Sequence, residues 1–374
     1  MERRRGETCG EVFVPPLVHE ARRNRPPLIP NHRASLTRSR LRMGCYYSCQ
    51  KNSFLHSECH VIRDTCFAGF LRRDGLEVYL GIGCKRGLES RGICRKIGPM
   101  KFGICNEIFQ NWALEDAMSY AKKAGYDCIE IAPFTLLPGT AGKYVTAISA
   151  AERRTIRDTA ARVGIEISGI HWVLVQADGM YLTHPDAAVR GRTADYFVAL
   201  ADFCGDLGGK SIVVGSPKQR NVMAGVSPAQ AWDWATQVFR PAVERAAERG
   251  VTICFEPLAP VETNFINTAA EGIVFAQQFR SPAMSVILDV KAMSSDTKPI
   301  PQIIHESRGN FGYFHANDVN LKGPGFGDVD FKPIAAALKE VGYGGVVSVE
   351  VFTFEEGPEV IATQSLAYLK KTFA

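Results

Sequence analysis

The sequence lacks any apolar run of the roughly 18 residues that a membrane-spanning helix needs. Its basic N-terminus is not followed by the apolar stretch and small-residue cleavage site of a secretory signal. Transit peptides are poor in acidic residues, whereas glutamate occurs at positions 2, 7, 11 and 20. These absences argue against secretion and membrane insertion, and they predict a cytoplasmic protein that does not act at a membrane.

Positive charge is not in excess over most of the chain, although the formal net charge is +5. The first 99 residues contain 19 Lys and Arg against 9 Asp and Glu, while the remaining residues contain 25 against 30. Most of the chain therefore lacks the basic footprint that nucleic-acid binding usually needs. We expect a small-molecule enzyme with no nucleic acid partner.

Residues 1–99 have no sustained period of 3.6 or 2, and they contain Arg clusters and a Pro-rich stretch. The paired C-x₂-C spacing of zinc modules is also missing among the possible ligands there, which are Cys45, Cys49, Cys59, His60 and Cys66. We therefore predict a basic, Cys-rich, poorly structured extension. The favoured interpretation is that this extension is non-native or mis-assigned, with natural translation beginning at Met100.

The four cysteines of residues 100–374 lie far apart and inside apolar runs. Disulfides are rare in reducing compartments, and a free cysteine behaves as a small hydrophobic residue. We expect buried free thiols at Cys105, Cys128, Cys204 and Cys254.

From Lys101 onward, short β-branched apolar runs alternate with longer amphipathic stretches, a pattern typical of βαβ units and a parallel sheet. Eight strands are predicted: Phe102 to Ile108, Cys128 to Ala132, Glu166 to Ile170, Ser211 to Gly215, Thr252 to Glu256, Ser285 to Asp289, Gly312 to His315 and Val346 to Val351.

Helical patterns separate these strands, and several end in the glycine that a left-handed cap favours. They include Leu114 to Ala124, Ala150 to Val163, Ala187 to Leu207, Pro228 to Arg249 and Phe331 to Val341. No G-x-G-x-x-G follows the first strand, which disfavours an open dinucleotide-binding sheet. The predicted fold class is α/β, a (β/α)₈ TIM barrel over residues 100–374.

Catalytic groups of such barrels project from the C-terminal ends of the strands. Four polar residues end or nearly end the last four predicted strands, namely Glu256, Asp289, His315 and Glu350. Three carboxylates and an imidazole that converge would repel one another unless a cation neutralises them. Oxygen ligands with one imidazole suit Mn²⁺, Mg²⁺ or Co²⁺, and Zn²⁺ less well. The alternative is that each acid is satisfied separately by a helix N-terminus or a lysine.

The ordered motifs of this region resemble the xylose isomerase-like TIM barrel superfamily of sugar (phosphate) isomerases and epimerases, especially its ketose 3-epimerase and hydroxypyruvate isomerase branch. The resemblance covers residues 101–373. The motifs that carry it are Phe255-Glu256-Pro257-Leu258, Leu288-Asp289, His315-Ala316-Asn317-Asp318, Gly325-Phe326-Gly327-Asp328-Val329-Asp330 and Ser348-Val349-Glu350-Val351-Phe352.

This resemblance implies that Glu256, Asp289, His315 and Glu350 are the metal ligands, with Glu256 and Glu350 also the acid/base pair. Further positions implied or considered for substrate binding are His171, Trp172, Glu262 and Asn317. For His171 the alternative is a core histidine bonded to a backbone carbonyl, and Trp172 could serve only in packing. Related barrels often form dimers or tetramers, so a homo-oligomer is expected.

Two positions depart from the ketose 3-epimerase pattern: Ala292 stands where a substrate-binding histidine is expected, and Leu321 where an arginine is expected. Loop cations could replace these contacts by binding a phosphate or carboxylate. The candidates are Lys218, Arg220 and Lys291, and solvated loop cations are the alternative reading.

These residues together predict a divalent-metal-dependent isomerase or epimerase of a small sugar, sugar phosphate or related polyol ketone. Glutamate-mediated proton transfer would proceed through a metal-bound enediolate. The alternatives are a dehydratase of the inosose or dehydroshikimate type and a non-catalytic sugar-binding barrel. An apurinic endonuclease is disfavoured because residues 100–374 contain only four histidines, too few for a trinuclear zinc site.

Overall fold

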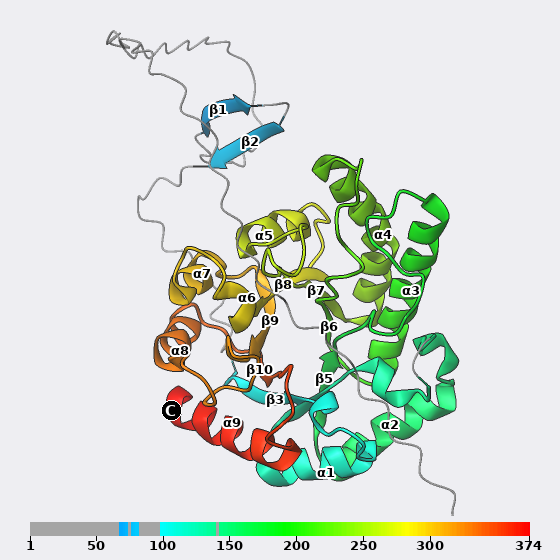
Figure 1. Cartoon of the computed structure of the whole chain (residues 1–374), viewed down its shortest axis with the longest axis vertical. Coiled ribbons are helices and arrows are strands. Elements are labelled where there is room, and N and C mark those ends of the chain that lie inside the picture. The colour runs from blue at the N-terminus through cyan, green and yellow to red at the C-terminus, as the bar shows by residue number, and fades with distance from the viewer. Residues whose placement is uncertain (1–66, 74–75, 82–97, 140–141) are drawn as a thin grey trace, which may run out of the picture. The chain divides into compact units, whose positions relative to one another are not determined.

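A closed barrel of parallel strands surrounded by helices forms the main body of the computed structural model, which describes residues 67–73, 76–81, 98–139 and 142–374 (Figure 1). Around the barrel the order is β10-β3-β4-β5-β6-β7-β8-β9. The strands are β3 (Lys101–Cys105), β4 (Cys128–Ile131), β5 (Glu166–Ile170), β6 (Ser211–Val214), β7 (Thr252–Phe255), β8 (Met284–Asp289), β9 (Phe311–Ala316) and β10 (Val346–Val349). The predicted (β/α)₈ barrel is therefore confirmed.

The α-helices of this body are α1 (Leu114–Ala124), α2 (Ala150–Val163), α3 (Ala187–Asp206), α4 (Pro228–Arg249), α5 (Ala269–Gln277), α6 (Val290–Met293), α7 (Ile300–Glu306), α8 (Phe331–Glu340) and α9 (Pro358–Phe373). Three short 3₁₀ helices accompany them: η1 (Asn106–Ile108), η2 (Pro133–Leu136) and η3 (Val145–Ala147). Glycine permits the left-handed turn that ends α1 and α4, where Gly125 has φ 103° and Gly250 has φ 64°.

The first barrel strand is shorter than predicted. The apolar run from Phe102 to Ile108 was expected to be one strand, but β3 ends at Cys105 and the chain turns into η1. This turn lies at the C-terminal end of the strand, which is the end of a TIM barrel that carries active sites. It places Glu107 in a buried turn instead of a strand.

Alternation along the strands decides which side chains face the barrel interior. A small separate apolar cluster contains Val213, Cys254, Ile287 and Tyr313, one from each of β6 to β9. Their sequence neighbours Ile212 and Ile253 belong to the larger cluster beneath the helices. Because successive strand residues point to opposite faces, the small cluster lines the interior. By the same alternation Glu130 and His315, whose neighbours pack beneath the helices, also point inward.

Outside the barrel, β1 (Phe67–Arg73) and β2 (Leu76–Gly81) pair antiparallel as a two-stranded sheet in a separate unit. The Asp-Gly dipeptide between these strands in the sequence is a strong hairpin signal that the sequence analysis overlooked. Most of residues 1–99, including all five possible zinc ligands, lie outside the described residues. The boundary at residue 100 stays a prediction.

All four cysteines of residues 100–374 are free and buried, as expected. Burial raises the pKa of Cys105, Cys128 and Cys254 to about 12 each. Among the described residues, no helix is long and apolar enough to cross a membrane.

The layer between barrel and helices should dominate stability. Phe239 of α4 is fully buried, with its ring centroid 4.7 Å from that of Phe197 and 5.9 Å from that of Phe255. We expect Phe239→Ala to lower the free energy of unfolding by about 3–5 kcal/mol, because it leaves a cavity. Urea denaturation measures this loss. The control Val261→Ala, at a side chain that is 90% exposed, should change it by less than about 0.5 kcal/mol. Equal losses in both variants would contradict this packing.

Candidate active site

Four potential metal ligands converge at the C-terminal ends of adjacent strands. Glu256 follows β7, Asp289 ends β8, His315 lies in β9 and Glu350 follows β10. One ligand atom from each side chain lies within 4.8 Å of the others, and all four residues are buried. The sequence analysis placed these residues at neighbouring strand ends, and the structure brings them together.

Burial and mutual repulsion shift the pKa values of the carboxylates in this cluster. Burial, together with Asp289 and Glu350, raises the pKa of Glu256 well above its ordinary value. Burial and Glu350 raise the pKa of Asp289 to about 6. Burial also opposes ionisation of Glu350, but the neighbouring His315 outweighs it and lowers the pKa of Glu350. Carboxylates crowded in this way are typical of a site that a cation neutralises.

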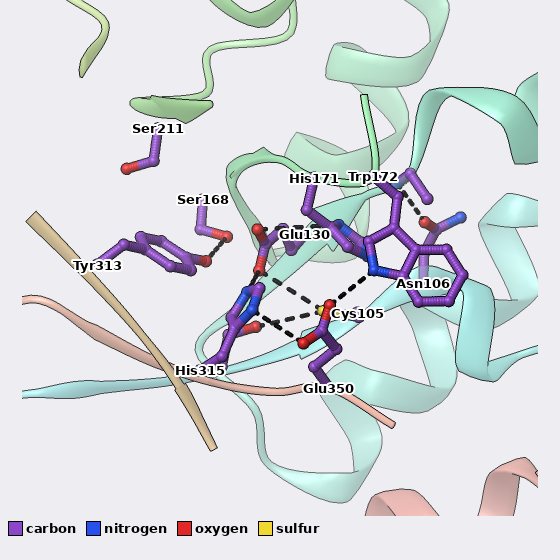
Figure 2. A network of polar contacts seen from close by, with 12 residues as sticks. Cys105, Asn106, Glu130, Ser168, His171, Trp172, Ser211, Tyr313, His315 and Glu350 are labelled. Atoms are coloured by element: carbon purple, nitrogen blue, oxygen red, sulfur yellow. Dashed lines mark hydrogen bonds and ion pairs between the residues drawn. The ribbon is translucent and has the colours of Figure 1, made fainter. Parts of the chain in front are cut away.

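Figure 2 shows the imidazole of His315 between the carboxylates of Glu130 and Glu350. Its Nε2 lies 3.1 Å from Oε2 of Glu130, which as a carboxylate accepts the hydrogen bond and so holds the proton on Nε2. Its Nδ1 lies 3.1 Å from Oε2 of Glu350 without hydrogen-bond geometry and has no partner among the described residues. Burial opposes protonation of His315, but Glu350 and Glu130 outweigh it and raise its pKa. A divalent cation bound at Nδ1 would take the place of the proton there. A carboxylate behind a ligating histidine is a recurrent feature of metal sites.

A second group of buried polar residues lies behind His315, and the sequence analysis missed most of it. His171, directly after β5, has its Nε2 2.8 Å from Oε2 of Glu107 and its Nδ1 3.8 Å from Oε1 of Glu130. Burial opposes protonation of His171, but the two carboxylates outweigh it and raise its pKa. His171 is therefore paired with carboxylates, and the alternative that it bonds to a backbone carbonyl is not favoured. Cys105 lies 3.6 Å from Glu130 in the same group.

Trp172 holds one of the four converging carboxylates. Its indole Nε1 donates a hydrogen bond of 2.8 Å to Oε1 of Glu350 (Figure 2). The indole stacks on Phe134 and Phe352, each with ring centroids 6.0 Å away. Its backbone has φ 49°, an unusual conformation for a bulky residue. Such strain persists only where surrounding contacts over-determine it, and here the hydrogen bond to Glu350 and the two stacked rings hold Trp172.

The other residues predicted to bind substrate have different surroundings in the structure. Asn317 donates to the carboxylates of both Asp289 and Glu350, so it orders two of the four converging groups. Lys291 pairs with Glu262, with its Nζ 2.7 Å from Oε1. Arg220 is fully buried and donates to the backbone carbonyl of Glu256 at 2.6 Å. Lys218 is exposed.

The sequence of this chain is similar to a family of barrel proteins and to two curated sugar epimerases. The family model described as "Xylose isomerase-like TIM barrel" matches residues 118–372. An L-ribulose 3-epimerase of Mesorhizobium japonicum is 27% identical over 242 residues, which cover 65% of this chain and 76% of that protein. A D-psicose 3-epimerase of Agrobacterium fabrum is 26% identical over 258 residues, which cover 68% and 85%.

The structural comparison supports the fold. A crystal structure of D-psicose 3-epimerase in the presence of D-fructose aligns with a TM-score of 0.63 at 23% identity. The alignment covers 73% of this chain and 99% of that one. At this level of identity the likeness shows a common fold.

If the four converging residues bind a cation, the metal should stabilise the folded chain. A ligand at about 100 times its dissociation constant adds about 2.7 kcal/mol to the free energy of unfolding. We therefore expect Mn²⁺ to raise the melting temperature of chelator-treated protein, as measured by calorimetry. His315→Ala should abolish the increase. The control His305→Ala, at an exposed residue paired with Glu340, should keep it. An increase of equal size in both variants would refute the site.

The contact between Glu130 and His315 gives a separate prediction. Glu130→Gln keeps the side-chain size but removes the negative charge that makes the imidazole a better ligand. We expect Mn²⁺ affinity, measured by titration calorimetry, to fall about 10- to 100-fold. The control Glu166→Gln changes a glutamate whose side chain is 65% exposed and which pairs with Lys101. Unchanged affinity in Glu130→Gln would mean that Glu130 does not act through His315.

Proposed function

Because the chain belongs to the xylose isomerase-like TIM barrel family, we propose that it is a metal-dependent epimerase acting beside the carbonyl group of a sugar or related polyol ketone. The two curated relatives described above are 3-epimerases of ketoses and align over 76% and 85% of their own lengths. Both proteins support an activity on sugars. Their identities of 26–27% leave the particular sugar open.

The arrangement of two glutamates within the four-residue cluster carries this proposal. Glu256 and Glu350 follow β7 and β10, which are separated in the barrel by β8 and β9. They therefore approach the centre of the cluster from the two ends of an arc of four strands. A substrate carbon held between them would have one carboxylate on each face. Removal of a proton by one glutamate and return by the other inverts that carbon, which is epimerisation.

A divalent ion held by Glu256, Asp289, His315 and Glu350 would supply Lewis acidity, which weakens the bond to a proton beside a carbonyl. The chain supplies the proton transfer and its geometry. Trp172 fixes one oxygen of Glu350 by its indole hydrogen bond, which leaves the second oxygen directed at the cluster. Asn317 restrains Asp289 and Glu350 relative to one another. Both contacts preorganise the carboxylates, and preorganisation lowers the barrier to reaction.

Substrate contacts differ from the typical ketose 3-epimerase pattern. The histidine expected three residues after Asp289 is replaced by Ala292, and the expected arginine by Leu321. The neighbouring Lys291 pairs with Glu262, and its ammonium group lies 4.4 Å from the ring centroid of Phe352. This ion pair is the proposed replacement for hydrogen bonds to substrate hydroxyl groups. It favours a substrate that differs from the free ketoses of the relatives.

Solvent exchange tests the proposed proton transfer. In deuterated water with Mn²⁺, the product should carry deuterium at the carbon beside the carbonyl, detected by NMR and mass spectrometry. We expect Glu350→Gln to lower the rate by at least about 10²- to 10⁴-fold, the usual loss for a general acid or base. The control Glu355→Gln, at an exposed residue five positions away, should react at the rate of the unaltered chain.

The product distinguishes this function from its rivals. A product lighter by one water molecule would indicate a dehydratase. Full activity of Glu350→Gln would exclude the two-glutamate mechanism. Binding of sugars with neither exchange nor product would favour a non-catalytic sugar-binding barrel.

A further inference from the structure

A cavity of about 580 Å³ lies beside the cluster of Glu256, Asp289, His315 and Glu350. Trp172 and Glu107 belong to its wall. Trp172 is hydrogen-bonded to Glu350, so the cavity begins one side chain away from the converging carboxylates. Its volume falls in the range of about 300–1,000 Å³ that is usual for sites that bury drug-sized ligands. Such ligands are larger than one sugar ring.

Aromatic rings form much of the cavity wall. They belong to Phe109, Trp112, Phe134, Trp172 and Phe354. Phe134 and Trp172 stack nearly parallel, with an interplanar angle of 15°. Phe109 and Trp112 lie with ring centroids 5.5 Å apart. Because Trp172 is stacked on both Phe134 and Phe352, the rings of Phe109, Trp112 and Phe354 are the ones that can bury the apolar C–H face of a sugar while leaving its hydroxyl edge free for hydrogen bonds.

Two hydrogen-bond acceptors on the same wall lack partners. Oε1 of Glu107 and Oε1 of Gln176 are buried, and neither accepts a hydrogen bond from the described residues. The Glu107 side chain is only 3% exposed, and its other oxygen is bonded to His171. A buried acceptor without a donor costs free energy. A ligand that brings O–H groups would satisfy both oxygens.

The hydrogen bonds that the wall requires narrow the choice of ligand. An ionised phosphate or carboxylate group only accepts hydrogen bonds, so it would leave the oxygens of Glu107 and Gln176 without donors. Lys143, also on the wall, donates its Nζ to the backbone carbonyl of Phe134 at 2.8 Å. A hydrocarbon tail would bury the rings but leave both acceptors unsatisfied. A neutral sugar ring meets both requirements, since it has an apolar face and several hydroxyl donors.

We propose that this cavity binds a second, neutral sugar ring, so that the substrate is a ketose carrying a glycosidic sugar. The inference rests on the proposed function for the reacting ring, which lies at the carboxylate cluster. The second ring stacks on the aromatic wall and donates hydroxyl hydrogen bonds to Glu107 and Gln176. It thereby supplies contacts that Ala292 and Leu321 do not.

The test compares D-fructose with two ketose disaccharides, lactulose and isomaltulose, on the full chain with Mn²⁺. Titration calorimetry measures affinity, and deuterium incorporation at C3 of the ketose measures kcat/KM. We expect at least one disaccharide to exceed D-fructose about tenfold in affinity and in kcat/KM, equivalent to about 1.4 kcal/mol. If neither disaccharide exceeds D-fructose in affinity or kcat/KM, the inference is overturned.

Variants of the wall locate the effect. Trp112→Leu removes one aromatic face and should reduce the preference for the disaccharide about tenfold, back to that of D-fructose. Trp232→Leu is the matched control, because Trp232 is also half-buried but packs against Phe265 and Phe275 away from the cavity. Gln176→Asn is a second variant that is independent of core packing. Its backbone has φ 58°, which asparagine tolerates, and the shorter side chain withdraws the acceptor.

The outcomes separate this inference from the proposed function. Exchange on D-fructose with no gain for either disaccharide would leave the epimerase proposal standing and remove the second-ring site. Tighter binding of a disaccharide without exchange on any sugar would support the site and refute epimerisation. A preference that survives both Trp112→Leu and Gln176→Asn would overturn the assignment to this cavity.

Discussion

Buried negative charge at the mouth of the barrel is the constraint on which the rest of this site depends. Five carboxylates, those of Glu107, Glu130, Glu256, Asp289 and Glu350, are each at most 5% exposed. Buried charges are tolerated only when they are paired, hydrogen-bonded or bound to a metal. His171 and His315 lie between Glu107, Glu130 and Glu350 and offset part of the charge. Glu256 and Asp289 keep raised pKa values, so the local compensation is incomplete where a cation would bind.

Glu130 and the four converging residues lie at different depths in the barrel, because they occupy different positions along their strands. The four converging residues are at or just beyond the C-terminal ends of β7 to β10, whereas Glu130 lies within β4. Glu130 points inward, where it meets His315 across the barrel at 3.1 Å. Its pKa falls to about 2, because the two histidines outweigh the effect of burial. An ionised Glu130 is therefore a fixed negative charge behind the imidazole. The fold thus commits Nε2 of His315 to Glu130 and leaves Nδ1 on the side where a cation would bind.

The sequence allowed the barrel and the four converging residues to be predicted, because both depend on local patterns. Each of Glu256, Asp289 and His315 ends an apolar run, and parallel strands bring such ends to one rim. Glu130 was missed because it interrupts an apolar run, Cys-Ile-Glu-Ile, instead of ending it. Glu107 was missed because the turn into η1 is not visible in an apolar pattern. Asn317 contacts Asp289 and Glu350 only because β8, β9 and β10 are adjacent in the barrel. No local sequence pattern predicts that adjacency.

The reacting carboxylates and the cavity are held by different parts of the fold. The carboxylate cluster is attached to strands that are hydrogen-bonded on both sides, so its geometry is hard to alter without opening the barrel. The cavity is formed mainly by η1 and the loop that leads from it into α1, by η2 and by the loop after β5, and these segments are not hydrogen-bonded into the barrel on both sides. Ala292 in α6 and Leu321 in the loop after β9 also lie outside the barrel strands, so such substitutions can change the recognised substrate while the reacting groups stay in place. Because Trp172 bonds Glu350 and also lines the cavity, it connects the two parts. A ligand that fills the cavity would press on the indole that orients Glu350, so binding of the distal part of the substrate would favour the reactive geometry at the proximal part.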